Sequence, residues 1–244
     1  MIKSTFDLEH KLAGEGYRFI IGIDEAGRGP LAGPVVAGAV IVKTFDVPNG
    51  HQMSREMELI RDSKKLSGKQ REAVYDFICE NFHVGIGICD HKTIDRINIL
   101  EATYLAAKKA VSNLCLKIDQ DTRDNDQTNY NLQITNSKQI SKNKIQNSKS
   151  IILFDGNKNI PNLSIEQKAI INGDSVVKSI SAASIIAKVT RDRIMLEMHE
   201  KYPNYKFDEH KGYGTGLHMK LLQEHGPCEI HRRSFAPVRK LAQH

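Results

Sequence analysis

Four acidic residues share one setting in this chain: each follows an apolar run and stands beside glycine or other small residues. They are Asp24, Glu25, Asp155 and Asp174. Apolar runs of this kind are typical of buried strands, and strand ends at one edge of an α/β sheet are where sites assemble. Carboxylates that converge there could bind hard cations such as Mg²⁺ or Mn²⁺, which prefer oxygen ligands and would relieve the mutual repulsion of the acids. The pattern therefore indicates a metal site of the kind that hydrolyses phosphodiesters.

A simpler interpretation is that each acid only caps a turn, because aspartate favours turns on its own account. That interpretation would be preferred for any single Asp-Gly pair, but four such acids favour a common site. Asp24 and Glu25 raise a geometric problem, since neighbours on a regular strand point to opposite faces of the sheet. Both can serve one site only if the strand twists into its loop, which Ala26 and Gly27 permit.

The elements that would position these acids can be predicted from the spacing of apolar residues. A buried strand is expected over 18–24, and further strands over 35–42, 84–89, 151–154 and 169–171. One helix is expected after an N-cap at Ser67, a second with a shared face of Leu100, Tyr104, Ala107, Val111 and Leu114, and a third around Ala182, Ile185, Ile186 and Val189, with Lys188, Arg191 and Arg193 on its other faces. Strands in succession, then alternating with helices, predict an α/β fold in which a mixed sheet is covered by helices.

Composition narrows the class of protein. The chain has 244 residues, which suits one large domain, and 35 Lys and Arg against 29 Asp and Glu, a modest surplus that fits a polyanionic partner. The four cysteines are far apart in sequence and form no C-x-x-C pair, which argues against a structural zinc site or a disulfide framework. Neither a membrane-spanning apolar run nor a signal-peptide pattern is present, so a cytoplasmic location is expected.

Residues 119–150 differ from the rest of the chain because Asn, Gln, Ser, Lys and Asp dominate them. Little in this stretch could offset the entropy of ordering it. It is expected to form a disordered or loosely packed loop between a helix and a strand. The alternative is an arm that contacts nucleic acid through Lys138, Lys142, Lys144 and Lys149.

Several motifs, in order along the chain, resemble those of the type 2 ribonuclease H family, ribonuclease HII. They are Asp24-Glu-Ala-Gly-Arg-Gly-Pro-Leu-Ala-Gly-Pro34, Asp62-Ser-Lys-Lys-Leu-Ser67, Ile94-Asp-Arg-Ile-Asn-Ile-Leu-Glu-Ala-Thr103, Asp155-Gly156, Gly173-Asp174, Ser181-Ala-Ala-Ser-Ile-Ile-Ala-Lys-Val-Thr-Arg-Asp-Arg193, His210-Lys-Gly-Tyr-Gly-Thr215 and His231-Arg-Arg-Ser-Phe-Ala-Pro237. The resemblance extends from about residue 17 onward. Residues 119–150 look like an insertion into this pattern, and the first 16 residues do not match it strongly.

The resemblance implies that residues 1–244 form a single catalytic domain with an RNase H-like mixed sheet, flanking helices and a helical C-terminal part. It implies an endonuclease that hydrolyses the RNA strand of RNA–DNA hybrids and cuts 5′ of ribonucleotides embedded in duplex DNA, leaving 3′-hydroxyl and 5′-phosphate ends, as in ribonucleotide excision repair. Asp24, Glu25, Asp155 and Asp174 would bind two ions of Mg²⁺ or Mn²⁺. No membrane partner is expected, and the protein is expected to be a monomer.

The resemblance also assigns substrate contacts. Gly27, Arg28 and Gly29 would bring backbone groups against the ribose 2′-hydroxyl; the alternative is that the glycines only turn the chain between strands. Tyr213 would pack on the deoxyribose at the RNA–DNA junction, since a tyrosine between glycines is poorly placed for a core. Lys64 would contact phosphate, although an exposed lysine is more often only solvated. The histidines are expected to be structural or on the surface.

Three other functions fit parts of the pattern. Ribonuclease HIII has the same chemistry, but that family lacks the arginine between the two glycines and carries an added N-terminal domain, whereas about 17 residues precede the first strand here. A non-catalytic nucleic-acid-binding protein would be favoured by loss of one of the four acids, and all four are present. A resolvase or transposase with the same fold does not have to recognise a ribose 2′-hydroxyl. The Gly-Arg-Gly motif and Tyr213 therefore argue against this class of enzyme.

Overall fold

A mixed β-sheet forms the centre of the protein. The structure is a computed structural model that describes residues 4–42, 55–61, 66–125, 145 and 148–241. These residues form a five-stranded sheet in the order β3-β2-β1-β4-β5. The strands are β1 (Phe19–Ala26), β2 (Val35–Val42), β3 (Phe82–Cys89), β4 (Ser150–Asp155) and β5 (Glu166–Ile170). β1 pairs antiparallel with β2 and β2 with β3, whereas β4 runs parallel to β1 and β5 parallel to β4. The predicted mixed sheet is therefore confirmed.

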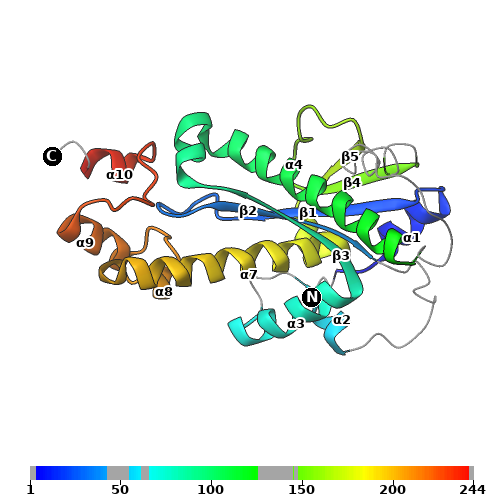
Figure 1. The fold of residues 1–244 in the computed structure, drawn as a ribbon, viewed down its shortest axis with the longest axis horizontal. Helices are drawn as coiled ribbons and strands as arrows, with labels where there is room; N and C mark the ends of the chain where they lie inside the picture. The colour runs from blue at the N-terminus through cyan, green and yellow to red at the C-terminus, as the bar shows by residue number, and fades with distance from the viewer. Residues whose placement is uncertain (1–3, 43–54, 62–65, 126–144, 146–147, 242–244) are drawn as a thin grey trace.

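Helices cover both faces of the sheet and form the C-terminal part. They are α1 (Asp7–Gly14), α2 (Arg55–Leu59), α3 (Gly68–Asn81), α4 (His91–Asn125), α6 (Gly173–Val176), α7 (Lys178–Lys201), α8 (Phe207–His210), α9 (Gly216–His225) and α10 (Ala236–Leu241). Figure 1 shows α4 and α7 on opposite sides of the sheet, with α8, α9 and α10 together at one end. Among the described residues, no helix combines the length and apolar character needed to span a membrane.

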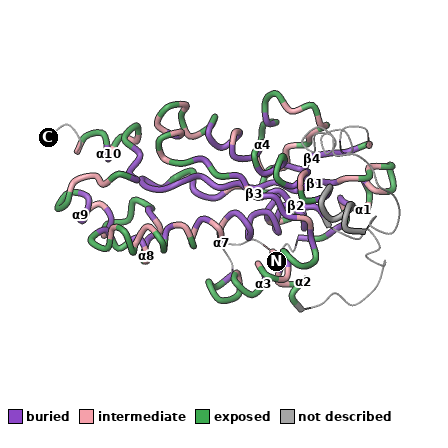
Figure 2. The backbone as a smooth tube through the Cα atoms, in the orientation of Figure 1, coloured by how far each residue is buried: buried purple, intermediate pink, exposed green. Residues whose placement is uncertain are grey.

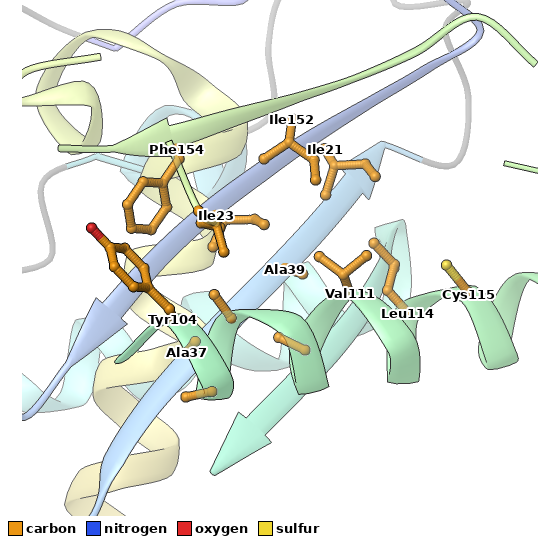
Figure 3. Close-up of a cluster of buried hydrophobic side chains, with 14 of the residues drawn as sticks. Ile21, Ile23, Ala37, Ala39, Tyr104, Val111, Leu114, Cys115, Ile152 and Phe154 are labelled. Carbon is orange, nitrogen blue, oxygen red and sulfur yellow. The ribbon is translucent and has the colours of Figure 1, made fainter. Parts of the chain in front are cut away.

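Alternate residues of β1 face different helices, and this alternation fixes the direction of each acid. Ile21 and Ile23 belong to the core beneath α4, where Figure 3 shows Ile21 beside Ile152 and Ile23 beside Phe154. Ile20 belongs to the opposite cluster, which includes Ile180 of α7. Because side chains alternate along a strand, Asp24 continues the series that faces α7, and Glu25 continues the series that faces α4.

Glycines in the sheet allow α7 to pack closely against it. A Cβ atom at Gly22 would lie 2.3 Å from the backbone carbon of Ser179, and one at Gly38 would lie 2.5 Å from the carbonyl oxygen of Ala183. Side chains at these positions would push the helix away from the strands. The close approach explains why the first half of α7 is almost wholly buried, as Figure 2 shows, and it brings α7 next to the end of β1.

The predicted helices are present, with two differences. Ser67 caps α3 as expected: its hydroxyl accepts from the Gln70 backbone N–H, and the Gln70 side chain accepts from the Ser67 N–H. Leu100, expected on the buried face of its helix, is 38% exposed. The reason is a break in α4 at Asn98, where φ is 67° and the side chain caps the segment that follows. Arg191, expected on an outer face of α7, is instead completely buried.

The first residues of the stretch 119–150 are helical rather than a loop, because α4 continues to Asn125, and residues 126–144 and 146–147 lie outside the described residues. At its other end, the Ser150 hydroxyl donates to the carbonyl of the buried Ile145. Lys149 is held against the domain, because its ammonium donates to the Glu15 carbonyl and lies over the Tyr17 ring. Lys138, Lys142 and Lys144 lie outside the described residues, so the proposed arm stays a prediction.

Helix α7 has a cap supplied by a distant residue. Glu9 of α1 is buried, and its carboxylate accepts from the Ser179 backbone N–H at 2.8 Å, in the first turn of α7. Burial raises the pKa of Glu9 despite this hydrogen bond. The folded state therefore binds the proton more tightly than the unfolded state, and the carboxylate lowers the stability of the fold increasingly as pH rises above the unfolded pKa.

We expect Glu9→Gln to be as stable as the unmodified protein near pH 4 and more stable at pH 7, because the amide oxygen still accepts from Ser179 and no charge is buried. Glu9→Ala should be less stable than Glu9→Gln at both pH values by about 1–3 kcal/mol, the cost of an unpaired buried donor. Thermal unfolding of the three proteins at pH 4 and pH 7 checks this. A Gln variant whose advantage does not grow with pH would contradict it.

Candidate active site

Two of the predicted acids meet because their strands are parallel neighbours. Ile23 of β1 is in register with Phe154 of β4. Asp24 and Asp155, the next residue on each strand, therefore lie side by side at the same edge of the sheet. They also face the same side, since Leu153, two residues before Asp155, belongs to the cluster beneath α7. Side chains on adjacent parallel strands at matching positions are close together, and the geometry therefore brings these two carboxylates into one site.

Asp174 reaches the same place from a turn after β5. The chain reverses at Asn172, whose φ of 54° is left-handed, and then enters the short helix α6 rather than the simple turn that was predicted. The Asp155 carboxylate accepts from the Gly173 backbone N–H at 2.8 Å, which fastens this turn to the end of β4. On the other side, the Ser181 hydroxyl of α7 donates to the Asp174 carbonyl. These two contacts fix the backbone on both sides of Asp174.

The three aspartates form a compact acidic group. One carboxylate oxygen from each of Asp24, Asp155 and Asp174 lies within 4.8 Å of the others, and Asp24 and Asp174 are buried. Burial is the main reason that the pKa of Asp24 is raised well above its ordinary value, and the charges of Glu25 and Asp155 raise it further. Three converging carboxylate oxygens are the donor set that Mg²⁺ and Mn²⁺ prefer. A divalent cation fits this group and would offset the repulsion within it.

Glu25 lies outside the set of three aspartates whose carboxylate oxygens are within 4.8 Å of one another. Pairing between β1 and β2 continues regularly to Ala26, so the strand does not turn into its loop at Asp24 and Glu25, although the sequence permitted such a turn. The Glu25 carboxylate forms an ion pair with Arg28 at 3.3 Å. After burial, the Glu25 charge is the next cause that raises the pKa of Asp24, ahead of the charge of Asp155, and the role of Glu25 as a metal ligand stays a prediction.

Two buried arginines, neither of which the sequence predicts to be buried, contact the turn after β1. Gly27 has a φ of +99°, and a Cβ atom there would lie 2.2 Å from the Arg191 Nε. Arg191 and Arg232 are both fully buried, and both donate to backbone carbonyls of this turn. Burial lowers the pKa of the Arg232 guanidinium to about 9. Both lie in motifs already quoted, but hydrophobic patterns cannot signal a buried arginine.

Tyr213 and two residues of the turn at 27–29 are exposed, whereas Gly27 is buried. Tyr213 is 40% exposed, as predicted for a residue outside the core. Its ring lies 5.5 Å from the Arg191 guanidinium carbon and 5.8 Å from the Lys188 ammonium. Arg28 and Gly29 are exposed. Lys64, the remaining predicted contact, lies outside the described residues.

Three buried histidines, His210, His218 and His231, pack beneath Tyr213, in agreement with the structural role expected for histidines. His218 Nδ1 lies 3.0 Å from the Tyr213 carbonyl oxygen, and His218 Nε2 lies 3.0 Å from His231 Nε2. Since a carbonyl can only accept, His218 donates through Nδ1 and accepts through Nε2 from His231. Burial lowers the pKa of His218 to about 4 and that of His231 to about 3. Both rings are therefore neutral at pH 7, as this arrangement requires, and His210 stacks on His218.

All four cysteines, Cys79, Cys89, Cys115 and Cys228, are free thiols in the structure.

Comparison with known proteins gives consistent matches over almost the whole chain. Residues 21–238 match the family model described as Ribonuclease HII. A curated protein named Ribonuclease HII from Caldicellulosiruptor bescii is 47% identical over 234 residues, which are 96% of this chain and 94% of that protein.

Solved structures show the same fold at lower identity. The ribonuclease H2 from Pyrococcus horikoshii OT3 has a TM-score of 0.61 at 24% identity, and the match covers 92% of this chain and 97% of that one. The structure titled Bst-RNase HIII in complex with Mn²⁺ has a TM-score of 0.60 at 17% identity and covers 93% of this chain and 70% of that one. The predicted RNase H-like architecture is confirmed.

Proposed function

This chain belongs to the ribonuclease HII family, a group of type 2 ribonucleases H that act as endonucleases on RNA–DNA hybrids, and from that membership we propose a more specific activity. The protein cuts on the 5′ side of ribonucleotides embedded in duplex DNA, as well as within the RNA strand of hybrids, and leaves 3′-hydroxyl and 5′-phosphate ends. The observation that carries the proposal is the convergence of Asp24, Asp155 and Asp174 at the end of β1, which leads into a turn exposed at Arg28 and Gly29.

The carboxylates would hold the metal ions of the reaction. Asp24, Asp155 and Asp174 supply oxygen ligands within 4.8 Å of one another, and Glu25, whose charge acts on Asp24, would complete the set from the neighbouring position. Divalent cations bound there would activate a water and stabilise the leaving 3′ oxygen. Mg²⁺ and Mn²⁺ both suit this donor set.

Recognition of ribose is assigned to the backbone of Gly27, Arg28 and Gly29. The turn is exposed at Arg28 and Gly29, and glycine leaves its backbone groups accessible to a sugar hydroxyl. Tyr213 would pack on the deoxyribose that follows the ribonucleotide, and Lys64 would contact a phosphate. RNA–DNA hybrids and ribonucleotide-containing duplexes are the proposed partners, and we expect a monomeric protein in the cytoplasm that serves ribonucleotide excision repair.

A labelled DNA duplex with one embedded ribonucleotide tests the proposed function. With Mg²⁺ or Mn²⁺ present, we expect one cut, 5′ of the ribonucleotide, with a 3′-hydroxyl on the upstream product. The matched all-DNA duplex should stay intact, and chelation of the metal should stop the reaction. Cleavage of the all-DNA duplex, or none of either, would refute the proposal.

The ring of Tyr213, rather than its hydroxyl, is expected to carry its contribution. Tyr213→Phe should therefore keep most activity on the embedded ribonucleotide. Tyr213→Ala should lower kcat/KM by an amount that corresponds to about 1–3 kcal/mol of transition-state stabilisation, the usual contribution of a stacking contact. The exposed position of the ring predicts little change in melting temperature for either variant. If Tyr213→Ala were as active as the unmodified protein, Tyr213 would not contact the substrate.

A further inference from the structure

Arg232 donates four hydrogen bonds to the backbone of the turn that follows β1. Its guanidinium donates to the carbonyl oxygens of Gly27 at 2.6 Å, Arg28 at 3.0 Å, Gly33 at 3.0 Å and Pro34 at 3.1 Å. Gly27 and Arg28 lie at the start of the turn and Gly33 and Pro34 lie at its end, so the Arg232 side chain connects the two ends of the turn. Arg232 has no exposed surface, and it therefore lies behind the turn, where substrate cannot touch it.

Arg191 of α7 adds a second connection and extends it to Tyr213. Its guanidinium donates to the carbonyl oxygens of Pro34 at 3.0 Å and Ala32 at 3.2 Å. The Pro34 carbonyl thus accepts from both arginines. On its other side, the Arg191 guanidinium lies 5.5 Å from the Tyr213 ring, close enough for a cation–π contact. Arg191 is therefore a direct link between the turn and the tyrosine.

The backbone on either side of Tyr213 is tied to the same turn. The Leu31 N–H donates to the Gly212 carbonyl, and a Cβ atom at Gly212 would lie 2.6 Å from the Ala32 carbonyl oxygen. Ala32 also forms a β-bridge with His231, which is hydrogen-bonded to His218 beneath Tyr213. The turn and the tyrosine are thus held at a fixed separation through several contacts, most of which involve residues 231–232 or Arg191.

A purely structural role explains this arrangement poorly. Moving a guanidinium out of water carries a large desolvation penalty, and replacing buried charged groups by apolar side chains of similar volume is often neutral or stabilising. Two adjacent buried guanidinium groups also repel each other. What they do provide is donors in a rigid, planar arrangement that fixes several carbonyls at once. That property matters most where a backbone has to be placed accurately.

We propose that Arg191 and Arg232 are positioning residues that fix the distance between the Gly27–Gly29 turn and the Tyr213 ring, and that this distance sets the preference for a ribonucleotide followed by a deoxyribonucleotide. The inference rests on the proposed function. In a duplex with one ribonucleotide, only one register places ribose on the turn and the next deoxyribose on Tyr213. In a long hybrid, every nucleotide of the cut strand carries ribose, so the separation discriminates between registers much less.

Arg232→Lys tests this idea because it keeps the charge but loses the planar set of donors. The readout is the ratio of kcat/KM for the embedded ribonucleotide to kcat/KM for a long RNA–DNA hybrid. We expect this ratio to fall about tenfold or more, since a small misplacement of a substrate contact can reduce the rate by that order. Arg233→Lys is the matched control, because the adjacent side chain is exposed, and its ratio should be unchanged.

The same substitution made in a Tyr213→Ala protein distinguishes a positioning role of Arg232 from a general loss of structure. In a Tyr213→Ala protein, Arg232→Lys should leave the ratio within about twofold, because residues that act through one another are not additive. Arg191→Lys should reproduce the pattern, and it replaces Arg232→Lys if that variant does not fold. An unchanged ratio in a folded variant, or an equal fall in the Tyr213→Ala background, would overturn the inference. Failure of the unmodified protein to cut the embedded ribonucleotide would instead refute the proposed function.

Discussion

Asp24→Asn is expected to abolish cleavage while the protein stays folded. Asp24 is the buried member of the acidic group that comes from the central strand, and its amide variant supplies a much weaker ligand for a divalent cation. Since bound metal contributes several kcal/mol to such reactions, we expect kcat/KM to fall by about a thousandfold or more. The measurement is cleavage of a labelled substrate with Mg²⁺ and with Mn²⁺.

Stability provides the control for this result. Without metal, the charge of Asp24 is unfavourable in the folded protein, because burial and the neighbouring acids raise its pKa. Asp24→Asn should therefore melt at the same temperature as the unmodified protein or higher. Mn²⁺ should raise the melting temperature of the unmodified protein, as any ligand of the folded state does, and should do so less in the variant.

Asp76→Asn makes the same chemical change at an exposed position of α3 and should behave as the unmodified protein in both assays. Comparable turnover by a folded Asp24→Asn protein would remove Asp24 from the metal site.

The strands and the acids at their ends could be predicted because burial on both faces produces apolar runs that are visible in the sequence. The runs before Asp24 and Asp155 became the adjacent strands β1 and β4. The regularity of β1 could not be predicted. Its pairing continues to Ala26, whereas the sequence equally permitted a twist at that point.

Other features depend on contacts that leave no local signal. Arg191 and Arg232 are buried because carbonyls of the turn at 27–34 accept their hydrogen bonds. Since every residue carries a backbone carbonyl, these acceptors cannot be recognised in the sequence. The long-range cap that Glu9 provides to Ser179 is equally invisible, because it connects residues 170 positions apart. The break at Asn98 could in principle be anticipated, since asparagine tolerates a positive φ, but the apolar periodicity around it favours a continuous helix.

The glycines of the turn at 27–29 are expected to have separable roles. At Gly27 the φ of +99° is unfavourable for any other residue, and an added Cβ atom would meet the Arg191 Nε at 2.2 Å and the Pro34 carbonyl oxygen at 2.6 Å. Strain and overpacking together predict that Gly27→Ala destabilises the protein by about 2–4 kcal/mol. Cleavage should fall with it, because Arg191 would have to move.

Gly29→Ala is the matched comparison, because a Cβ atom at Gly29 would have no atom within 4 Å and the residue is exposed. Its melting temperature should be unchanged. If the backbone of the turn approaches the ribose, the added methyl group would still stand between the two, and kcat/KM on the embedded ribonucleotide should fall without loss of stability. A Gly29→Ala protein with full activity would mean that Gly29 only turns the chain. Equal stability of the two variants would contradict the packing of Arg191 against Gly27, and with it the physical basis for a turn held from behind.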